Sequence, residues 1–395
     1  MEKIKIIQLQ FPDRLIKVNS FLVAVIISAN IIAIAINMLT GLNNSIVLPF
    51  IICSLISFVV NRKINLIVVI PLILFFLSFF FVSYIQIGAS THLKGYLLSF
   101  CTFGITSFII TLQPFDVKRV MSYITLIYVL ASWVLPNMDI DNMLPGNKMG
   151  LGYLILPIIL VCISQLANVN INLQKKIFYL ILVVWYGYFI IKVGTRGAFL
   201  SIVLYVFFLL ILNKKFTLSR VITYVSSFVV FILVYSNFLS ILLFVKGILG
   251  NINIKSNFID KSILLIEEDN IFNGRDSLYG LAFDGFKESW LYGNGIGFFN
   301  DFYGTYVHNI FLQMLNETGV LLVIPFVLII FYGLFQILFS KKIDRSIKFF
   351  ICFIFSLVIP KLMVSSIFWK EQLFWILVIM IISIRWFKNY HISKN

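Results

Sequence analysis

Residues 64–86 read INLIVVIPLILFFLSFFFVSYIQ, a stretch of the chain without a single charged side chain. A helix of about 20 apolar residues crosses a hydrocarbon core about 30 Å thick. Comparable apolar runs recur along all 395 residues, of which 61% are hydrophobic and 42 are Phe. Soluble domains are only about half apolar. The sequence therefore predicts an all-α fold, that of a polytopic helical membrane protein.

We predict about 12 transmembrane helices, which together make a single transmembrane domain over residues 1–395. They are expected near residues 18–39, 44–60, 64–86, 96–112, 120–136, 150–168, 177–193, 197–213, 221–245, 307–340, 348–367 and 371–387. The first helix is expected to be retained, because it is of full membrane length and lacks a small-residue cleavage site. The cysteines lie in apolar segments, where we expect packing residues and neither a disulfide nor a metal site. These cysteines are Cys53, Cys101, Cys162 and Cys352.

Lys and Arg are distributed unequally between the two sides of the predicted membrane domain. The two tails and the alternate loops on the same side carry 20 of the 31 basic residues and four acidic residues. The opposite side carries 11 basic and 12 acidic residues. Cytoplasmic loops are enriched in Lys and Arg. Both termini are therefore expected in the cytoplasm, and the formal charge of +15 does not require a nucleic acid partner.

This topology places the long polar loop 246–306 outside the cytoplasm, where ATP and nucleotide sugars are absent. Any reaction there must use a substrate that is already activated. Within the loop, Asn273–Asp276 is expected to open an amphipathic helix that lies on the membrane surface or on the outer ends of other helices. The acidic cluster Glu267–Asp269 is expected to solvate the loop.

Four cations lie in or beside apolar segments and are candidates for binding an anion. Arg196 lies in the turn Gly-Thr-Arg-Gly-Ala between two spans, with Lys192 one helical turn earlier. Arg196 either anchors a helix end by snorkelling or clamps a phosphate with its planar guanidinium. Arg275 precedes the amphipathic helix, where a cation is unfavourable for the helix dipole, and is either an isolated loop residue or a ligand. Lys361 lies inside a span and is expected to snorkel, pair with a carboxylate or line a cavity.

A polar stripe is predicted where the chain returns to the membrane. Asn309, Gln313 and Asn316 have the spacing i, i+4 and i+7, and Glu317 follows them. Polar groups at membrane depth must face a cavity or other helices. His308 begins this segment and is either a structural hydrogen-bonding residue or a general base.

The run Gly293-Asn294-Gly295-Ile296-Gly297 resembles a nucleotide-binding glycine pattern only superficially. No parallel strand or βαβ unit is predicted around it, and both are needed for that function. We therefore predict a flexible turn that brings the long loop back to the membrane.

Taken in order, these motifs resemble the O-antigen polymerase and O-antigen ligase superfamily of bacterial inner-membrane glycosyltransferases. The motifs are Gly194–Ala198, Asn273–Arg275, the Trp290 segment with its glycine run, His308-Asn309 and Glu317-Thr318-Gly319. The resemblance covers about residues 192–340, and the first half of the chain matches only as a series of spans. Thr195 stands where many relatives have Ser, which preserves the hydroxyl group.

The resemblance implies an undecaprenyl-diphosphate-linked oligosaccharide as the substrate, within the lipid bilayer of the inner membrane. It associates Arg196 and Arg275 with the diphosphate and His308 with the acceptor, as the catalytic residues. Further substrate-binding residues are expected among Lys192, Asn309, Gln313, Glu317 and Lys361. We expect no metal and no cofactor, and as partners a chain-length regulator and a flippase of the same pathway.

Three functions remain open. A polymerase would join lipid-linked repeat units, whereas a ligase would move finished glycan onto lipid A-core or another acceptor. A transporter or flippase for lipid-linked oligosaccharides would need cations along a central path and internal repeats. We detect no repeat between the two halves, which favours an enzyme, and of the two enzymes we favour the polymerase.

Overall fold

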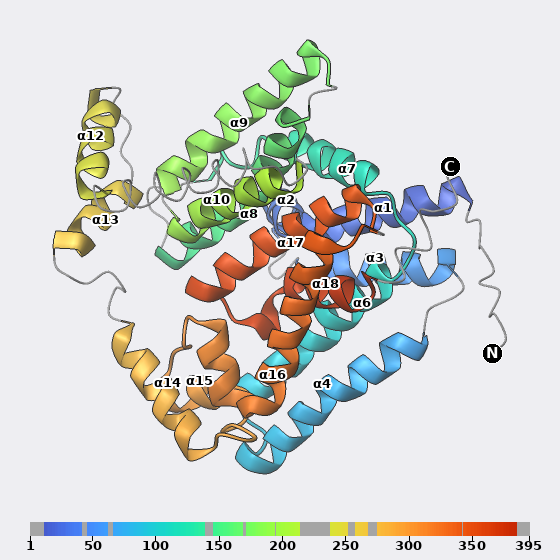
Figure 1. The fold of residues 1–395 in the computed structure, drawn as a ribbon, viewed down its shortest axis with the longest axis vertical. Coiled ribbons are helices and arrows are strands. Elements are labelled where there is room, and N and C mark those ends of the chain that lie inside the picture. The colour runs from blue at the N-terminus through green and yellow to red at the C-terminus, as the bar shows by residue number, and fades with distance from the viewer. Residues whose placement is uncertain are drawn as a thin grey trace. The chain divides into compact units, whose positions relative to one another are not determined.

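The computed structural model describes residues 12–41, 46–61, 66–138, 145–168, 171–193, 195–213, 238–251, 257–267, 275–341 and 343–384. The regular secondary structure of these residues is entirely helical (Figure 1). Five helices are long and apolar enough to cross a membrane. The pair α1 (Asp13–Ile27) and α2 (Ala29–Thr40) is bent by 74° and makes a sixth span if counted as one. The protein is thus a helical membrane protein, as the composition predicts.

The described residues form two compact units. The first contains Met1–Met138 and Ser277–Asn395, and the second contains Asp139–Asp276. Beyond α1 and α2, the first unit has α3 (Val47–Asn61), α4 (Leu66–Ile87), α5 (Thr91–Ser99), the π-helix η1 (Phe100–Gly104), α6 (Ile105–Thr111), α7 (Val117–Leu130), α14 (Asp276–Glu288), α15 (Phe298–Tyr303), α16 (Ile310–Phe339), α17 (Arg345–Val364), the 3-10 helix η2 (Phe368–Lys370) and α18 (Gln372–Ile382). The second has α8 (Pro145–Leu166), α9 (Leu173–Val193), α10 (Arg196–Asn213), α12 (Phe238–Asn251) and α13 (Asn257–Glu267).

The predicted spans agree with the helices in position more closely than in length. The five long helices correspond to predictions at 64–86, 96–112, 177–193, 307–340 and 348–367. Helices α3 and α18 are apolar but shorter, as are the apolar parts Gly150–Leu166 of α8 and Gly197–Leu212 of α10. Helix α7 ends at Leu130, and a series of turns follows that reaches beyond Pro136. Most of the prediction at 221–245 lies outside the described residues, so the number of 12 spans stays a prediction.

Helix α18 forms the centre of the first unit. Residues 372–381 are all buried, and the helix packs against α6, α16 and α17. Aromatic rings fill the adjoining space: the Trp375 ring centroid lies 4.9 Å from that of Phe76 and 5.0 Å from that of Phe100. Burying such large rings supplies most of the apolar contact in a core of this kind.

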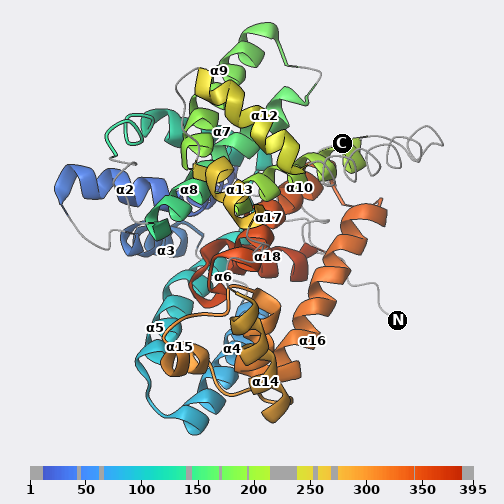
Figure 2. The same ribbon diagram turned by 90° about the vertical axis from the view of Figure 1, so that its left-hand side faces the viewer.

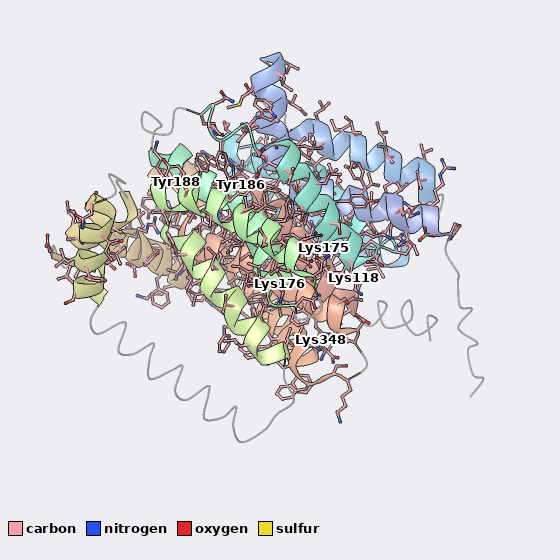
Figure 3. The ribbon with its side chains drawn as sticks, turned by 90° about the horizontal axis from the view of Figure 1, so that it is seen from above. Lys118, Lys175, Lys176, Tyr186, Tyr188 and Lys348 are labelled. Carbon is pink, nitrogen blue, oxygen red and sulfur yellow. The ribbon has the colours of Figure 1, made fainter. Side chains whose placement is uncertain are left out.

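In the second unit α8 packs against α9 and α10, and α13 packs against α9 and α12. Leu242, Ile259 and Ile263 form a small apolar cluster between α12 and α13. Figure 3 shows Lys175 and Lys176 near one end of α9 and Tyr186 and Tyr188 further along it. Helix α9 thus carries two basic residues near its start and one, Lys192, in its last turn.

The part of the predicted external loop that belongs to the first unit is well packed. Helices α14 and α15 gather with α4, α5 and α16 (Figure 2). Ala282 of α14, Phe299 of α15 and Val307 form a buried cluster against which Leu278 and Leu312 pack. The amphipathic helix is thus confirmed, and its apolar face lies on other helices, one of the two predicted places.

Candidate functional site

The site is built around a break in the long helix α16. Gly319 has φ 61° and ψ −161°, which interrupts the helical backbone within a segment of membrane length. Asn316, Glu317 and Thr318, just before the break, are all buried. A break at membrane depth leaves backbone N–H and C=O groups without helical partners, and these groups must be satisfied by other protein groups.

The end of the predicted external loop supplies those partners. The N–H groups of Asn294 and Gly295 donate to the carbonyl oxygens of Asn316 (2.7 Å) and Glu317 (3.0 Å). In return, the N–H of Val320 donates to the carbonyl oxygen of Trp290 at 3.0 Å. We call residues 290–295 the docking segment. Its backbone replaces the missing turn of α16, so the break is stabilised by the loop.

Such close backbone contact requires glycine on both sides. A Cβ atom on Gly319 would lie 2.3 Å from the carbonyl oxygen of Leu291. A Cβ atom on Gly293, which has φ 72°, would lie 2.4 Å from the carbonyl carbon of Glu317. The run thus forms a turn, and its glycines also allow two backbones to approach each other.

The docking segment and the residues after it are also held by α4. The side chain of Gln86 donates to the carbonyl oxygen of Gly293 at 3.1 Å, and the hydroxyl of Ser83 accepts from the N–H of Ile296 at 2.9 Å. Ile296 is completely buried. This part of the predicted flexible turn is thus anchored at both of its faces, to α4 and to α16.

Glu317 is the central acidic group of this site. Its side chain is fully buried and accepts hydrogen bonds from Gln313 Nε2 at 3.1 Å and from Trp369 Nε1 at 2.8 Å. Both donors are neutral, and Glu317 forms no ion pair within the described part of the chain. A buried carboxylate without a cation is costly, and such groups mark functional sites in membrane proteins.

A cavity of about 170 Å³ lies beside this carboxylate, between α4 and α16. Its lining residues include Ser83, Glu317 and Thr318, together with Phe79 and Tyr292. The cavity thus lies beside polar and aromatic residues within a segment of membrane length.

A scan against protein-family models finds no match. A search of curated proteins also finds no significantly similar sequence. The resemblance to polysaccharide polymerases and ligases therefore rests on the motifs and their order, and it stays a prediction.

The polar stripe on α16 divides into different roles. Asn309 caps the helix, because its Oδ1 accepts from the N–H groups of residues 311 and 312 at 3.0 and 3.2 Å. The Asn316 amide donates to the carbonyl oxygen of Ala282 at 3.1 Å. The stripe thus faces protein groups, as its pattern predicts, and Gln313 is the member that reaches Glu317.

His308 has an unusual backbone conformation directly before this helix. Its φ of 60° is positive, which is uncommon for a residue with a side chain and is found at functional sites. Its ring lies against Tyr306, with ring centroids 3.8 Å apart, and the Tyr306 hydroxyl donates to the carbonyl oxygen of Ser365 at 3.0 Å. The imidazole is therefore held in a fixed place near the end of α17.

Lys361 pairs with the carboxylate of Glu371, which confirms one of the three alternatives given for it. Only 19% of the Lys361 side chain and 4% of the Glu371 side chain are exposed. The hydroxyl of Ser366 lies 3.4 Å from the same carboxylate. The pair joins the end of α17 to the start of α18 and thereby fixes η2, which carries Trp369.

The remaining predicted residues belong to the second unit. Lys192 lies in the last turn of α9, α10 begins at Arg196, and Arg275 directly precedes α14. Thr195 is buried and packs closely on Gly152 of α8. A Cβ atom on Gly152 would lie 2.3 Å from Thr195 Oγ1, which shows why position 152 needs a glycine. That Arg196, Arg275 and His308 surround one cavity stays a prediction, because they belong to two separately described units.

Sequence reasoning did not identify Trp369 and Glu371. Trp369 lies in the short connection between two predicted spans, and Glu371 is the first residue of the second of these spans, 371–387. An indole and two charged groups next to an apolar segment can indicate a functional site, but they are equally typical of residues at a membrane interface. Only the fold shows that Trp369 points to a carboxylate 52 residues earlier in the chain.

Proposed function

We propose that this chain is a membrane glycosyltransferase that polymerises oligosaccharide repeat units carried on undecaprenyl diphosphate. The observation that carries the proposal is the docking of residues 290–295 into the break of α16. It joins part of the long predicted external loop to the backbone of a membrane-length helix at Glu317, whose carboxylate is buried. A reaction between a lipid carrier and a polar glycan needs a polar loop and a membrane-depth helix in one site.

The proposed reaction joins an acceptor hydroxyl to a lipid-linked sugar. The hydroxyl oxygen bonds to the anomeric carbon, the bond from that carbon to the diphosphate oxygen breaks, and the hydroxyl proton passes to His308. General base catalysis of this kind contributes a factor of about 100 to 10,000. Arg196 and Arg275 neutralise the diphosphate that leaves, and Lys192 and Gln313 contribute to binding.

The proposal includes the predicted topology. About 12 spans, cytoplasmic termini and an external loop would place the site on the outer face of the bacterial inner membrane. The charge distribution supports this orientation. The product would be an O-antigen or a capsule-type polysaccharide.

Deletion of the gene in the native host tests the proposal. We expect surface glycan stalled at one repeat unit, with long chains restored by the wild type and by Lys175→Ala but not by Arg196→Ala. Lys175 is a matched control, because it is a basic residue at an end of α9 on the predicted cytoplasmic side. Long chains trapped on the lipid carrier would instead indicate the ligase. An unchanged size distribution would refute both enzymes.

A transporter for lipid-linked oligosaccharides is the second candidate, and the break in α16 favours it. Secondary transporters bind substrates and ions at interrupted helices near the middle of the membrane. In that case deletion of the gene would leave lipid-linked repeat units on the cytoplasmic face. Their accessibility to an enzyme added to inverted vesicles separates this function from polymerisation.

A further inference from the structure

Three side chains with oxygen acceptors lie on α16 directly before its break at Gly319. Gln313, Asn316 and Glu317 are 1%, 0% and 0% exposed. Residues three and four apart on a helix are neighbours, so Gln313 adjoins both Asn316 and Glu317. The hydrogen bond of 3.1 Å from Gln313 Nε2 to Glu317 Oε1 shows one of these contacts directly. Oxygen acceptors are thus enclosed at the point where a membrane-length helix is interrupted.

The carboxylate of Glu317 is surrounded by neutral donors. It accepts from Gln313 Nε2, from Trp369 Nε1 and from the backbone N–H of Gly297. An ionised carboxylate has about four acceptor sites, so these donors leave one for a further ligand. The hydrogen bonds orient the carboxylate, but they do not cancel its charge.

Charged groups on other elements of the first unit pair with one another instead. Lys361 of α17 pairs with Glu371, which directly precedes α18. His92 Nδ1 of α5 lies 2.5 Å from Asp301 Oδ1 of α15. A buried charge without a partner of opposite sign is costly. Since the described residues place no cation against Glu317, its environment favours the binding of one from solution.

The amide oxygens of Gln313 and Asn316 supply further acceptors. The amide nitrogens are assigned by their partners, which can only accept: the Glu317 carboxylate for Gln313, and the carbonyl oxygen of Ala282 for Asn316. Gln313 Oε1 and Asn316 Oδ1 are buried and have no hydrogen-bond partner among the residues that the structure describes. The two polar atoms of an amide are about 2.2 Å apart, so Gln313 Oε1 lies within about 5.3 Å of Glu317 Oε1.

We propose that Glu317 and Gln313 form a binding site for one alkali-metal cation such as Na⁺, with Asn316 as a neighbouring oxygen ligand. Oxygen ligands lie about 2.3–2.6 Å from Ca²⁺, whose radius is close to that of Na⁺, so one such cation bridges two oxygens about 5 Å apart. A single positive charge neutralises the single carboxylate. In the described ranges, no three His, Cys, Asp or Glu side chains lie together as a site for a transition metal.

The position of the site in α16 agrees with this ligand. Interrupted helices bind Na⁺ in membrane transporters, at the depth where the backbone is unwound. Glu317 is also among the lining residues of the cavity of about 170 Å³ described above. A cavity of this size has room for water molecules, which complete the shell of oxygen ligands around a cation.

Trp369 makes a direct test possible, because its Nε1 donates to the Glu317 carboxylate at 2.8 Å. The chain has six Trp residues, so 5-fluorotryptophan labelling gives six fluorine NMR signals that substitution by Phe assigns. The full chain in nanodiscs is titrated with NaCl or KCl against choline chloride, at constant ionic strength and pH. We expect the Trp369 signal to shift with saturation, and the signal of Trp185, which is 42% exposed on α9, to stay unchanged.

Glu317→Gln removes the charge and keeps an oxygen that accepts from Trp369. This variant is expected to weaken cation binding about tenfold or more, whereas Glu288→Gln, at an exposed carboxylate at the end of α14, leaves it unchanged. A shift with Na⁺ alone assigns the site to Na⁺, and a shift with both salts assigns it to alkali-metal cations in general.

The wild-type titration also decides the matter without any variant. No saturable shift of the Trp369 signal with either salt would overturn the proposal, and so would an equal shift in Glu317→Gln. A Trp369 signal that responds to pH but to neither salt would show that a proton neutralises Glu317 instead of a metal cation, which also overturns it. The titration contains no glycan, so its result is independent of the proposed function.

Discussion

Replacement of Gly319 by Ala tests the docking of the loop into α16. An Ala at φ 61° and ψ −161° adopts a backbone conformation that costs about 1–3 kcal/mol. Its Cβ would lie 2.3 Å from the carbonyl oxygen of Leu291, so the two backbones must separate. Separation removes the hydrogen bond from Val320 to Trp290 and leaves buried groups unpaired, at about 1–3 kcal/mol. The expected loss in the free energy of unfolding is therefore about 2–6 kcal/mol.

The assay is equilibrium unfolding of the purified protein in mixed micelles. Gly95→Ala is the matched control, because Gly95 lies in helix α5 and no atom lies within 4 Å of an added Cβ. An Ala at a helical position is favoured by about 1 kcal/mol over Gly. A free energy for Gly319→Ala within about 0.5 kcal/mol of that for Gly95→Ala would refute the docking argument.

Two further substitutions have matched controls within the same structure. Trp369→Phe removes a hydrogen-bond donor from the buried carboxylate of Glu317 and should lower the free energy of unfolding by about 1–3 kcal/mol. Trp375→Phe should lower it less, because Trp375 Nε1 is buried without a hydrogen-bond partner among the described residues. Gly285→Ala would place a Cβ 2.5 Å from Asn316 Nδ2 and should cost more than Gly280→Ala, where nothing lies within 4 Å. Unfolding free energies check both pairs, and equal values within a pair would contradict the stated contacts.

The sequence predicts the helices of this protein well, because long apolar runs are a strong local signal. The run at 64–86 and helix α4 agree closely, and so do the run at 307–340 and helix α16. The bend between α1 and α2 is not predictable in this way, since both sides of it are apolar. Helix ends depend on turns and packing, which apolar composition does not encode.

The candidate site was predictable only in part. The spacing of polar residues on α16 correctly indicates groups that face the protein interior. It does not show that Asn309 caps the helix or that Glu317 accepts a bond from Trp369, because such roles depend on contacts between distant segments. The pairing of His92 with Asp301 is invisible for the same reason, since 209 residues separate the partners.

The most direct test of the proposed function uses the purified protein alone, in liposomes that contain a single lipid-linked repeat unit. Polymerisation predicts a ladder of longer lipid-linked glycans together with released undecaprenyl diphosphate, at a rate that falls at least 100-fold in His308→Ala. Transfer of the intact lipid-linked unit between the leaflets, with no longer glycan formed at any protein concentration, would contradict the enzyme and identify a transporter.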